Sequence, residues 1–149
     1  MALSDTHTGP HKIQLDQWIS CAPFEQLLGL TIEEAHNGES HLYMDFVRKL
    51  AQGGGLAHGG ALVTLADTAV AMAVKSILPE NSRFGTISLA SEFLAPVTRG
   101  RVTARARTRI LENRKIEGRA DLFDHEGKKV MTFSSVFKVA RDVEMPAME

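Results

Sequence analysis

Residues 58–74 read HGGALVTLADTAVAMAV, and this stretch decides how the rest of the chain can fold. From Gly60 onward nearly every residue is apolar, and a helix that is apolar on almost all sides is surrounded by protein. Asp67 and Lys75 interrupt the run and glycines flank it, which favours a buried helix over a membrane span. The stretch therefore predicts one long central helix, which ends before Pro79 and the polar residues 80–83.

Segments typical of strands lie on both sides of this helix. Before it, the apolar spacing predicts a helix over 15–28 with a break before Pro23, a strand at 30–35, a turn at Asn37-Gly38 and an alternating strand at 41–46. After it, strands are predicted at 85–94, 101–111, 115–123 and 130–139. Because the connections are short, consecutive strands are expected to be antiparallel neighbours.

These elements predict an α+β protein in which a curved antiparallel sheet of five or six strands wraps around the long helix. The sheet can cover only one side of that helix, so a dimer is expected. The ends of the chain lack periodicity. We expect a single domain over 13–140, with a flexible N-terminal tail at 1–12 and a C-terminal tail at 141–149.

Composition narrows the functional classes. The chain has 149 residues, of which 44% are hydrophobic and 23% charged, and its formal net charge is −1. This is typical of one globular domain, and it does not favour nucleic-acid or membrane partners. The single cysteine, Cys21, cannot form an internal disulfide, and residues 1–12 have no apolar core of signal-peptide length. We therefore expect a cytoplasmic protein.

Asp67 is the most informative residue. An ionised carboxylate in an apolar helix is costly unless it is paired or has a function. Positions 63, 64, 70 and 71 offer no cation one helical turn away. Asp67 is therefore a candidate catalytic group, and the alternative is a structural carboxylate that binds backbone donors or a distant arginine.

The helix start is the second candidate feature. The first N–H groups of a helix lack internal partners and carry partial positive charge, and glycines let a ligand approach them closely. The sequence His58-Gly59-Gly60 thus fits an oxyanion site, although a simple turn into a helix would look the same.

The spacing of these two features predicts how they could cooperate. Gly59 and Asp67 are eight residues apart, which is ~12 Å along a helix axis. One carbonyl cannot contact both groups within a single subunit. If both act on one carbonyl, they come from different chains, and a symmetric dimer then has two active sites at its interface.

The residues around this site resemble a known family. The segment 54–69 resembles the His-Gly-Gly…Asp signature of the PaaI-type (phenylacetate-degradation-type) hot-dog thioesterases, within the 4-hydroxybenzoyl-CoA thioesterase-like superfamily. Two further patterns match: Phe-Leu-Ala-Pro at 93–96 followed by Gly100, and Asp-x-x-Gly at 124–127. The resemblance covers about residues 25–139. It implies a hot-dog fold and an acyl-CoA thioesterase that needs no cofactor, because coenzyme A is part of its substrate, and no metal.

The resemblance also implies roles for single residues. Asp67 would activate water or attack the thioester itself, and the Gly59 N–H would bind the thioester oxygen. Gln52 stands where the family often has asparagine, and it keeps the carboxamide with one more methylene. The other matching positions are Thr86, which would assist the carboxylate, and His58 and Gly60, which would hold the loop beside the substrate.

Coenzyme A is highly anionic, so basic residues are expected near the site. The candidates are Arg83, Arg114 and Lys115. The row formed by Arg101, Arg105, Arg107 and Arg109 is better interpreted as a solvated outer strand face. Such a face is also an option for the contact that joins two dimers into a homotetramer.

Two other functions fit the same residues. One is a hot-dog hydratase or dehydratase, and the other is a non-catalytic protein that binds acyl-CoA. The sequence also leaves the acyl group open among aryl, short-chain and medium-chain types.

Overall fold

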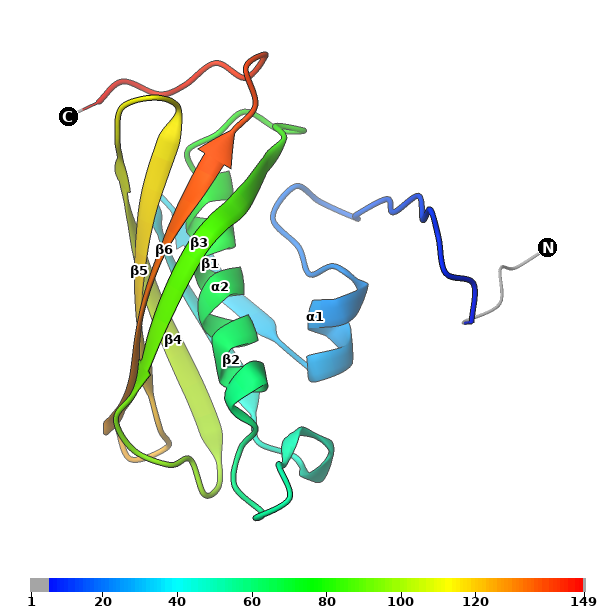
Figure 1. The fold of residues 1–149 in the computed structure, drawn as a ribbon, viewed down its shortest axis with the longest axis vertical. Coiled ribbons are helices and arrows are strands. Elements are labelled where there is room, and N and C mark those ends of the chain that lie inside the picture. The colour runs from blue at the N-terminus through cyan, green and yellow to red at the C-terminus, as the bar shows by residue number, and fades with distance from the viewer. Residues whose placement is uncertain (1–5, 149) are drawn as a thin grey trace.

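A computed structural model of the chain describes residues 6–148. Its elements are, in chain order, α1 (Pro23–Leu28), β1 (Thr31–His36), β2 (Glu39–Asp45), the 3₁₀ turn η1 (Arg48–Leu50), α2 (Gly59–Lys75), β3 (Phe84–Phe93), β4 (Arg101–Ile110), β5 (Lys115–Phe123) and β6 (Lys129–Val139). The long helix α2 lies between the sheet and the short helix α1 (Figure 1). The predicted α+β architecture, with one sheet around one long helix, is confirmed.

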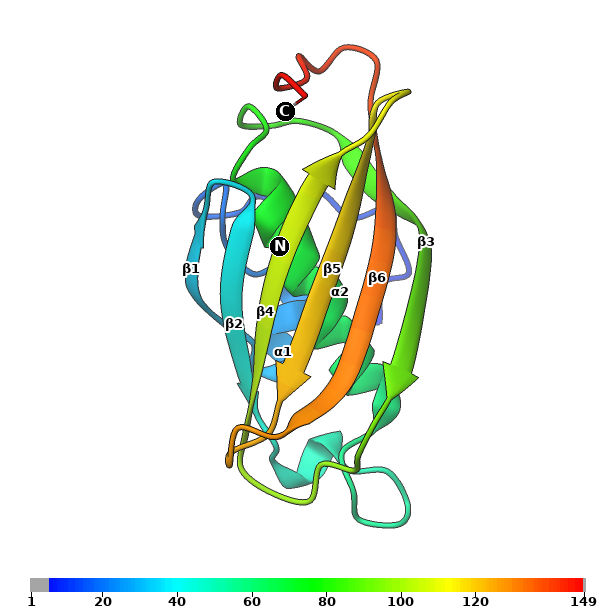
Figure 2. The same ribbon diagram turned by 90° about the vertical axis from the view of Figure 1, so that its left-hand side faces the viewer.

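The six strands form one antiparallel sheet in the order β1-β2-β4-β5-β6-β3 (Figure 2). The expectation that strands joined by short connections are neighbours is wrong for β3 and β4, because β3 pairs with β6. The connection between β3 and β4 instead passes the start of α2, where the Ala57 N–H donates to the Val97 carbonyl oxygen at 3.0 Å. This crossing leaves β3 at an edge of the sheet.

The core lies between α2 and the inner face of the sheet. The helix packs mainly on β2, β4 and β5, and its buried residues include Leu65, Ala66, Val70 and Val74. Gly118 allows the close approach, because a Cβ there would lie 2.1 Å from the Cγ1 of Val70. Alternation along β2 and β4 places their apolar side chains in this core, as their sequences predict.

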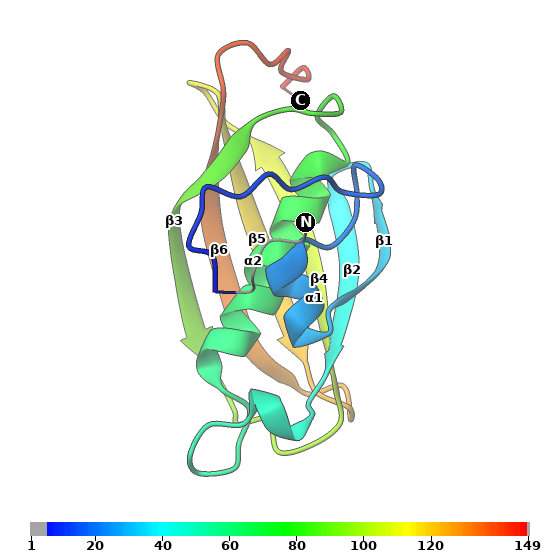
Figure 3. The ribbon, with the colours of Figure 1, turned by 90° about the vertical axis from the view of Figure 1, so that its right-hand side faces the viewer.

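The predicted helix over 15–28 is wrong in its first half, because only Pro23–Leu28 are helical. Proline restricts the residue before it to an extended conformation, and Ala22 has φ −78° and ψ 169°. The preceding segment crosses the outside of α2 (Figure 3). There the Trp18 Nε1–H donates to the Lys75 carbonyl oxygen and the Lys75 Nζ donates to that of Trp18, both at 2.9 Å. These contacts override the helical spacing of the apolar residues.

The edge strand β3 exposes apolar side chains. Ile87 is 55% exposed, Leu89 47%, Phe93 53% and the adjacent Leu94 49%. An exposed apolar edge strand is a ready template for pairing with another chain. The structure therefore presents a surface suited to the expected dimer.

The structure describes most of both predicted tails, and part of the C-terminal one packs on the domain. Residues 1–5 and 149, which belong to the two predicted tails, lie outside the described residues. In the C-terminal segment Val143 is buried, so this part of the chain packs on the domain. No helix within residues 6–148 has the length and apolar character needed to cross a membrane.

Candidate functional site

Helix α2 places Asp67 on its half-buried side, away from the sheet core. The Thr86 hydroxyl on β3 donates a hydrogen bond to Asp67 Oδ1 at 3.0 Å. Within residues 6–148 no lysine, arginine or histidine forms an ion pair with this carboxylate. The structure thus brings together Asp67 and Thr86, which were predicted to act together. The alternative of a carboxylate held by an arginine does not apply within residues 6–148.

Burial raises the pKa of the Asp67 carboxyl above its ordinary value. The hydrogen bond from Thr86 favours the ionised form and lowers this pKa, whereas the charge of Glu25 on α1 adds to the rise. A carboxylate with a raised pKa is a stronger base than an ordinary aspartate once it is ionised. Such a group is suited to taking a proton from water.

Replacing Thr86 with valine is expected to shift the acidic limb of the pH–rate profile to higher pH. The hydroxyl lowers the pKa of Asp67, so its loss raises that pKa further. A base works only when it is deprotonated, so activity then disappears at a higher pH as the solution is acidified. The measurement is kcat/KM against pH for both proteins. Coincident acidic limbs would show that Asp67 does not govern the profile or that Thr86 does not tune it.

The start of α2 has the free backbone N–H predicted from its sequence at Gly59, but the N–H of Gly60 is bound by His58. His58 is the N-cap, and its Nδ1 accepts the Gly60 N–H at 2.9 Å, which places the ring hydrogen on Nε2. The Ala61 and Leu62 N–H groups donate to the His58 carbonyl oxygen at 3.0 and 3.3 Å. Within residues 6–148 the Gly59 N–H has no hydrogen-bond partner. The Gly59 N–H is therefore available to donate to a ligand, whereas the Gly60 N–H is already used.

Gln52 and Gly59 line one groove of about 390 Å³ between the loop before α2 and the end of β3. The Gln52 Oε1 accepts the Gly54 N–H, so its Nε2 remains to donate to a ligand. The Phe93 ring forms the wall opposite Gly59, because a Cβ at Gly59 would lie 3.3 Å from it. The structure thus joins two further predicted site residues.

The predicted site residues therefore fall into two groups, which we call half-sites. One contains Asp67, in the middle of α2, and Thr86, near the start of β3. The other contains Gln52, in the loop before α2, and Gly59, at the start of α2, and it lies beside the end of β3. The half-sites are ~12 Å apart along the helix axis. A thioester bound by one half-site cannot reach the other within one subunit.

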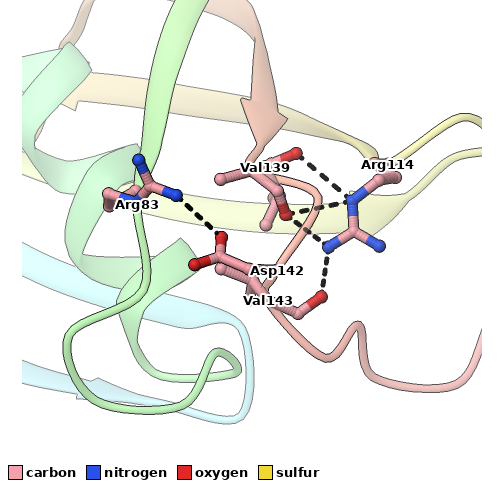
Figure 4. Close-up of polar contacts among 6 residues, drawn as sticks. Arg83, Arg114, Val139, Asp142 and Val143 are labelled. Carbon is pink, nitrogen blue, oxygen red and sulfur yellow. Dashed lines mark hydrogen bonds and ion pairs between the residues drawn. The ribbon is translucent and has the colours of Figure 1, made fainter.

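The basic residues predicted to contact coenzyme A lie near the start of β3, whereas the groove lies at its end. Figure 4 shows two of them, Arg83 and Arg114, beside the segment that follows β6. Arg83 pairs with Asp142 at 3.0 Å on the surface. The Arg114 guanidinium donates to the carbonyl oxygens of Val139, Ala140 and Val143, so it fastens the C-terminal segment. Within the described part of the chain Lys115 forms no ion pair. Contact of these three residues with coenzyme A stays a prediction.

The arginine row of β4 lies on the outer face of the sheet, as its alternation predicts. Arg101 pairs with Asp45 at 2.8 Å, and Arg109 pairs with Glu117 at 3.1 Å. Arg105 lies over the ring of Phe123 instead. This face is distant from Asp67, on the other side of the sheet.

Two features of the site were not predicted from the sequence. Glu25 is close enough to Asp67 to affect its pKa, although the sequence signals only a helix start, in which Glu25 accepts the Ala22 N–H at 3.3 Å. Phe93 and Leu94 form walls of the groove, although the sequence pattern at 93–96 supported only the family resemblance and not a place in the site. Neither position can be assigned to a site before the packing of α1, α2 and β3 is known.

Comparisons with known proteins agree with this geometry. The sequence model of the thioesterase superfamily matches residues 54–131. A Halobacterium salinarum protein, provisionally named an esterase, is 31% identical over 125 residues, which is 77% of this chain and 83% of that protein.

Solved structures are similar over most of the domain. The phenylacetic acid degradation protein PaaI of Thermus thermophilus, in a point-mutant form, has a TM-score of 0.70 at 30% identity, over 78% of this chain and 99% of that one. A thioesterase of Haemophilus influenzae has a TM-score of 0.73 at 26% identity, over 78% of this chain and 82% of that one. The family match includes the helix start and Asp67, since both lie within residues 54–131.

Proposed function

Because this chain belongs to the thioesterase superfamily and is a thioester hydrolase of the PaaI-type hot-dog fold, we propose that it hydrolyses acyl-coenzyme A with Asp67 as its catalytic carboxylate. The observation that carries the assignment of Asp67 is its environment. The carboxylate is half-buried, has a raised pKa, accepts a hydrogen bond from Thr86, and has no ion-pair partner within residues 6–148. This is the environment of a catalytic base rather than of a structural ion pair.

The proposed reaction needs an ionised Asp67 and a donor for the thioester oxygen. In the general-base route Asp67 takes a proton from water while the water oxygen attacks the carbonyl carbon. The Gly59 N–H and the Gln52 carboxamide stabilise the negative oxygen that forms. The C–S bond then breaks, and the proton from Asp67 passes to the coenzyme A thiolate. In the nucleophilic route the carboxylate attacks the carbonyl carbon directly, and the C–S bond breaks to release the coenzyme A thiolate and leave a mixed anhydride. Water then hydrolyses the anhydride to the free acid and Asp67, and a proton from this water passes to the thiolate.

The active site is proposed to be shared between two subunits. Asp67 adjoins Thr86 and Gly59 adjoins Phe93. A two-fold axis that places Asp67 against Gly59 of the partner subunit also places Thr86 against the partner's Phe93. It therefore pairs the two β3 strands antiparallel about their middle, near Leu89, where the exposed apolar side chains lie. One symmetry operation thus completes the sites and covers the edge strand.

The position of coenzyme A follows from this arrangement. Arg83 directly precedes β3, three residues before Thr86, so a coenzyme A that extends from Asp67 toward this end meets Arg83 and then Lys115. The outer face of the sheet remains available for two dimers to form a homotetramer. No further cofactor takes part in the proposed reaction.

A screen of acyl-CoA thioesters tests the proposal. We expect release of free thiol from at least one aryl, short-chain or medium-chain acyl-CoA, measured with a thiol reagent. A parallel assay of enoyl-CoA hydration is expected to show no conversion. Hydration without thiol release would identify a hydratase, and tight acyl-CoA binding without either reaction would identify a non-catalytic binding protein.

A further inference from the structure

A groove on the outer face of the sheet, which we call the arginine groove, lies over β4 and β5, two central strands in front of α2 in Figure 2. Its volume is about 520 Å³, and its lining consists of Arg107, Thr108 and Arg109 from β4 and Glu117 and Arg119 from β5. Three arginines and one glutamate give this lining a net charge of +2, whereas the whole chain has a net charge of −1. Positive charge is therefore concentrated on the face opposite to Asp67.

The register of β4 and β5 interrupts a regular pattern of opposite charges at this groove. Arg105 and Arg109 each lie opposite a carboxylate on β5, but Arg107 lies opposite Arg119. The Cβ atoms of directly opposed residues are about 5 Å apart, and like charges at this spacing destabilise a sheet. The stability of the sheet therefore does not explain the pair Arg107 and Arg119. Residues that break such a local rule are expected at functional sites.

Glu117 fixes two of the three guanidinium groups. The Arg119 Nε donates to Glu117 Oε1 at 3.0 Å, and the Arg109 Nη2 donates to Glu117 Oε2 at 3.1 Å. These hydrogen bonds lower the pKa of the Glu117 carboxyl, so it stays ionised and holds both arginines in place. A guanidinium group has five N–H donors, so most donors of both arginines remain for a ligand.

The third guanidinium group, that of Arg107, is less firmly paired. Within residues 6–148 its one ion-pair partner is Asp121, at 3.6 Å, and Asp121 also pairs with Lys129 at 3.5 Å. Glu39 lies opposite Arg107 on β2, but the two form no ion pair in the described chain. The positive charge of Arg107 is thus only partly compensated, and a bound anion would compensate it.

The lining also indicates the chemistry of the anion. Within the described chain the arginine groove has no aromatic or aliphatic residue in its lining that could bind a base or a lipid chain. The Thr108 hydroxyl donates to the Gly38 carbonyl oxygen at 2.8 Å, so its proton is already used. Guanidinium groups bind phosphate oxygens through paired hydrogen bonds. Three of them in one groove suit a chain of phosphate groups, which can contact all three at once.

We propose that the arginine groove binds a short oligophosphate through its phosphate groups alone, with Arg107, Arg109 and Arg119 as the binding residues. A phosphate chain between Arg107 and Arg119 would also remove the repulsion between these two side chains. The sheet separates this site from Asp67, so the proposal does not depend on the thioesterase reaction.

Isothermal titration calorimetry of the full-length protein with inorganic tripolyphosphate tests the proposal. We expect saturable binding at one site per subunit, at least ~10-fold tighter than the binding of orthophosphate, which cannot contact all three arginines. Added NaCl is expected to weaken this binding because the groove is exposed to solvent. Arg107→Gln and Arg119→Gln are each expected to weaken it at least ~10-fold, since each removes charge-assisted hydrogen bonds.

Arg101→Gln is the matched control. Arg101 lies on the same strand and the same face as Arg107, and its side chain is 50% exposed compared with 58% for Arg107. It pairs with Asp45 and does not line the arginine groove. The control variant loses the same charge, and we expect it to bind tripolyphosphate as tightly as the wild type does.

Thermal unfolding gives a second readout that is independent of enzyme activity. Tripolyphosphate is expected to raise the Tm of the wild type and of Arg101→Gln, but not that of Arg107→Gln. Without ligand, Arg107→Gln is expected to unfold at the same or a higher Tm than the wild type, because it removes a repulsion between like charges.

Three results would overturn the proposal. Equal weakening of binding by Arg101→Gln and Arg107→Gln would show a general effect of positive charge rather than a site. Loss of binding in Arg83→Gln, with normal binding in Arg107→Gln, would place the anion at the candidate coenzyme A residues. No binding of tripolyphosphate, together with a lower Tm of ligand-free Arg107→Gln, would assign these arginines to the stability of the sheet.

Discussion

The Asp67→Ala protein is expected to fold normally and to lose at least ~100-fold in kcat, because the group that activates water is gone. The remaining activity would come from the oxyanion donors and from binding alone. The measurement is steady-state hydrolysis of the best acyl-CoA from the screen, together with circular dichroism to confirm the fold. Turnover within a few-fold of the wild type would remove Asp67 from the mechanism.

The stability of the Asp67→Asn protein gives a second test, because a structural role of Asp67 predicts the opposite change in stability. Its pKa is raised in the folded protein, so the native state binds more protons than the unfolded state between the ordinary and the raised pKa. The free energy of unfolding therefore falls as the pH rises through that window. Asp67→Asn keeps the acceptor for Thr86 and removes the buried charge. We expect it to unfold at a higher urea concentration than the wild type at pH 7, whereas loss of a structural carboxylate would lower that concentration.

Two inactive variants are expected to restore activity when they form mixed dimers. Asp67→Ala removes the carboxylate, and Gly59→Pro removes the N–H that binds the oxyanion, which alone should cost ~100-fold or more. Proline suits the first position of a helix. His58 before it is extended, with φ −64° and ψ 129°, as a residue preceding proline must be. In a mixed dimer, one site receives the intact Asp67 and the intact Gly59, while the other receives neither.

Random pairing after equal co-expression is expected to give about one quarter of the wild-type activity, because half of the dimers are mixed and each has one working site of two. Each variant expressed alone serves as the control. If the co-expressed protein is as inactive as the two variants, each subunit holds its own complete site. That result would contradict the shared interface.

The regular elements with visible periodicity could be predicted from the sequence. The apolar run after Gly60 predicts a helix that is mostly buried, and α2 is such a helix. The alternation in 101–111 predicts a strand that is buried on one face, and β4 is such a strand. The apolar spacing of 15–28 was misleading. In its first half, before α1, the chain is not helical, and Trp18 packs on the end of α2 instead.

The strand order could not be derived from the lengths of the connections. Seven residues, 94–100, are enough to cross the start of α2, so a short connection does not require β3 and β4 to be neighbours. The position of β3 at the sheet edge decides where the exposed apolar side chains of this strand and the groove beside Gly59 lie. Both depend on which strand β6 pairs with, which is a property of the packed sheet.

The sequence by itself determined that Asp67 lacks a nearby cation, that glycines open the start of the same helix, and that the two features are too far apart to meet in one subunit. These conclusions need only helix geometry and the cost of burying charge, which are local. The tertiary structure decided that Thr86 and Glu25 tune the pKa of Asp67, that His58 occupies the Gly60 N–H, and that Phe93 and Leu94 wall the groove. These contacts join residues from different elements, and their geometry exists only once α1, α2 and β3 are packed together.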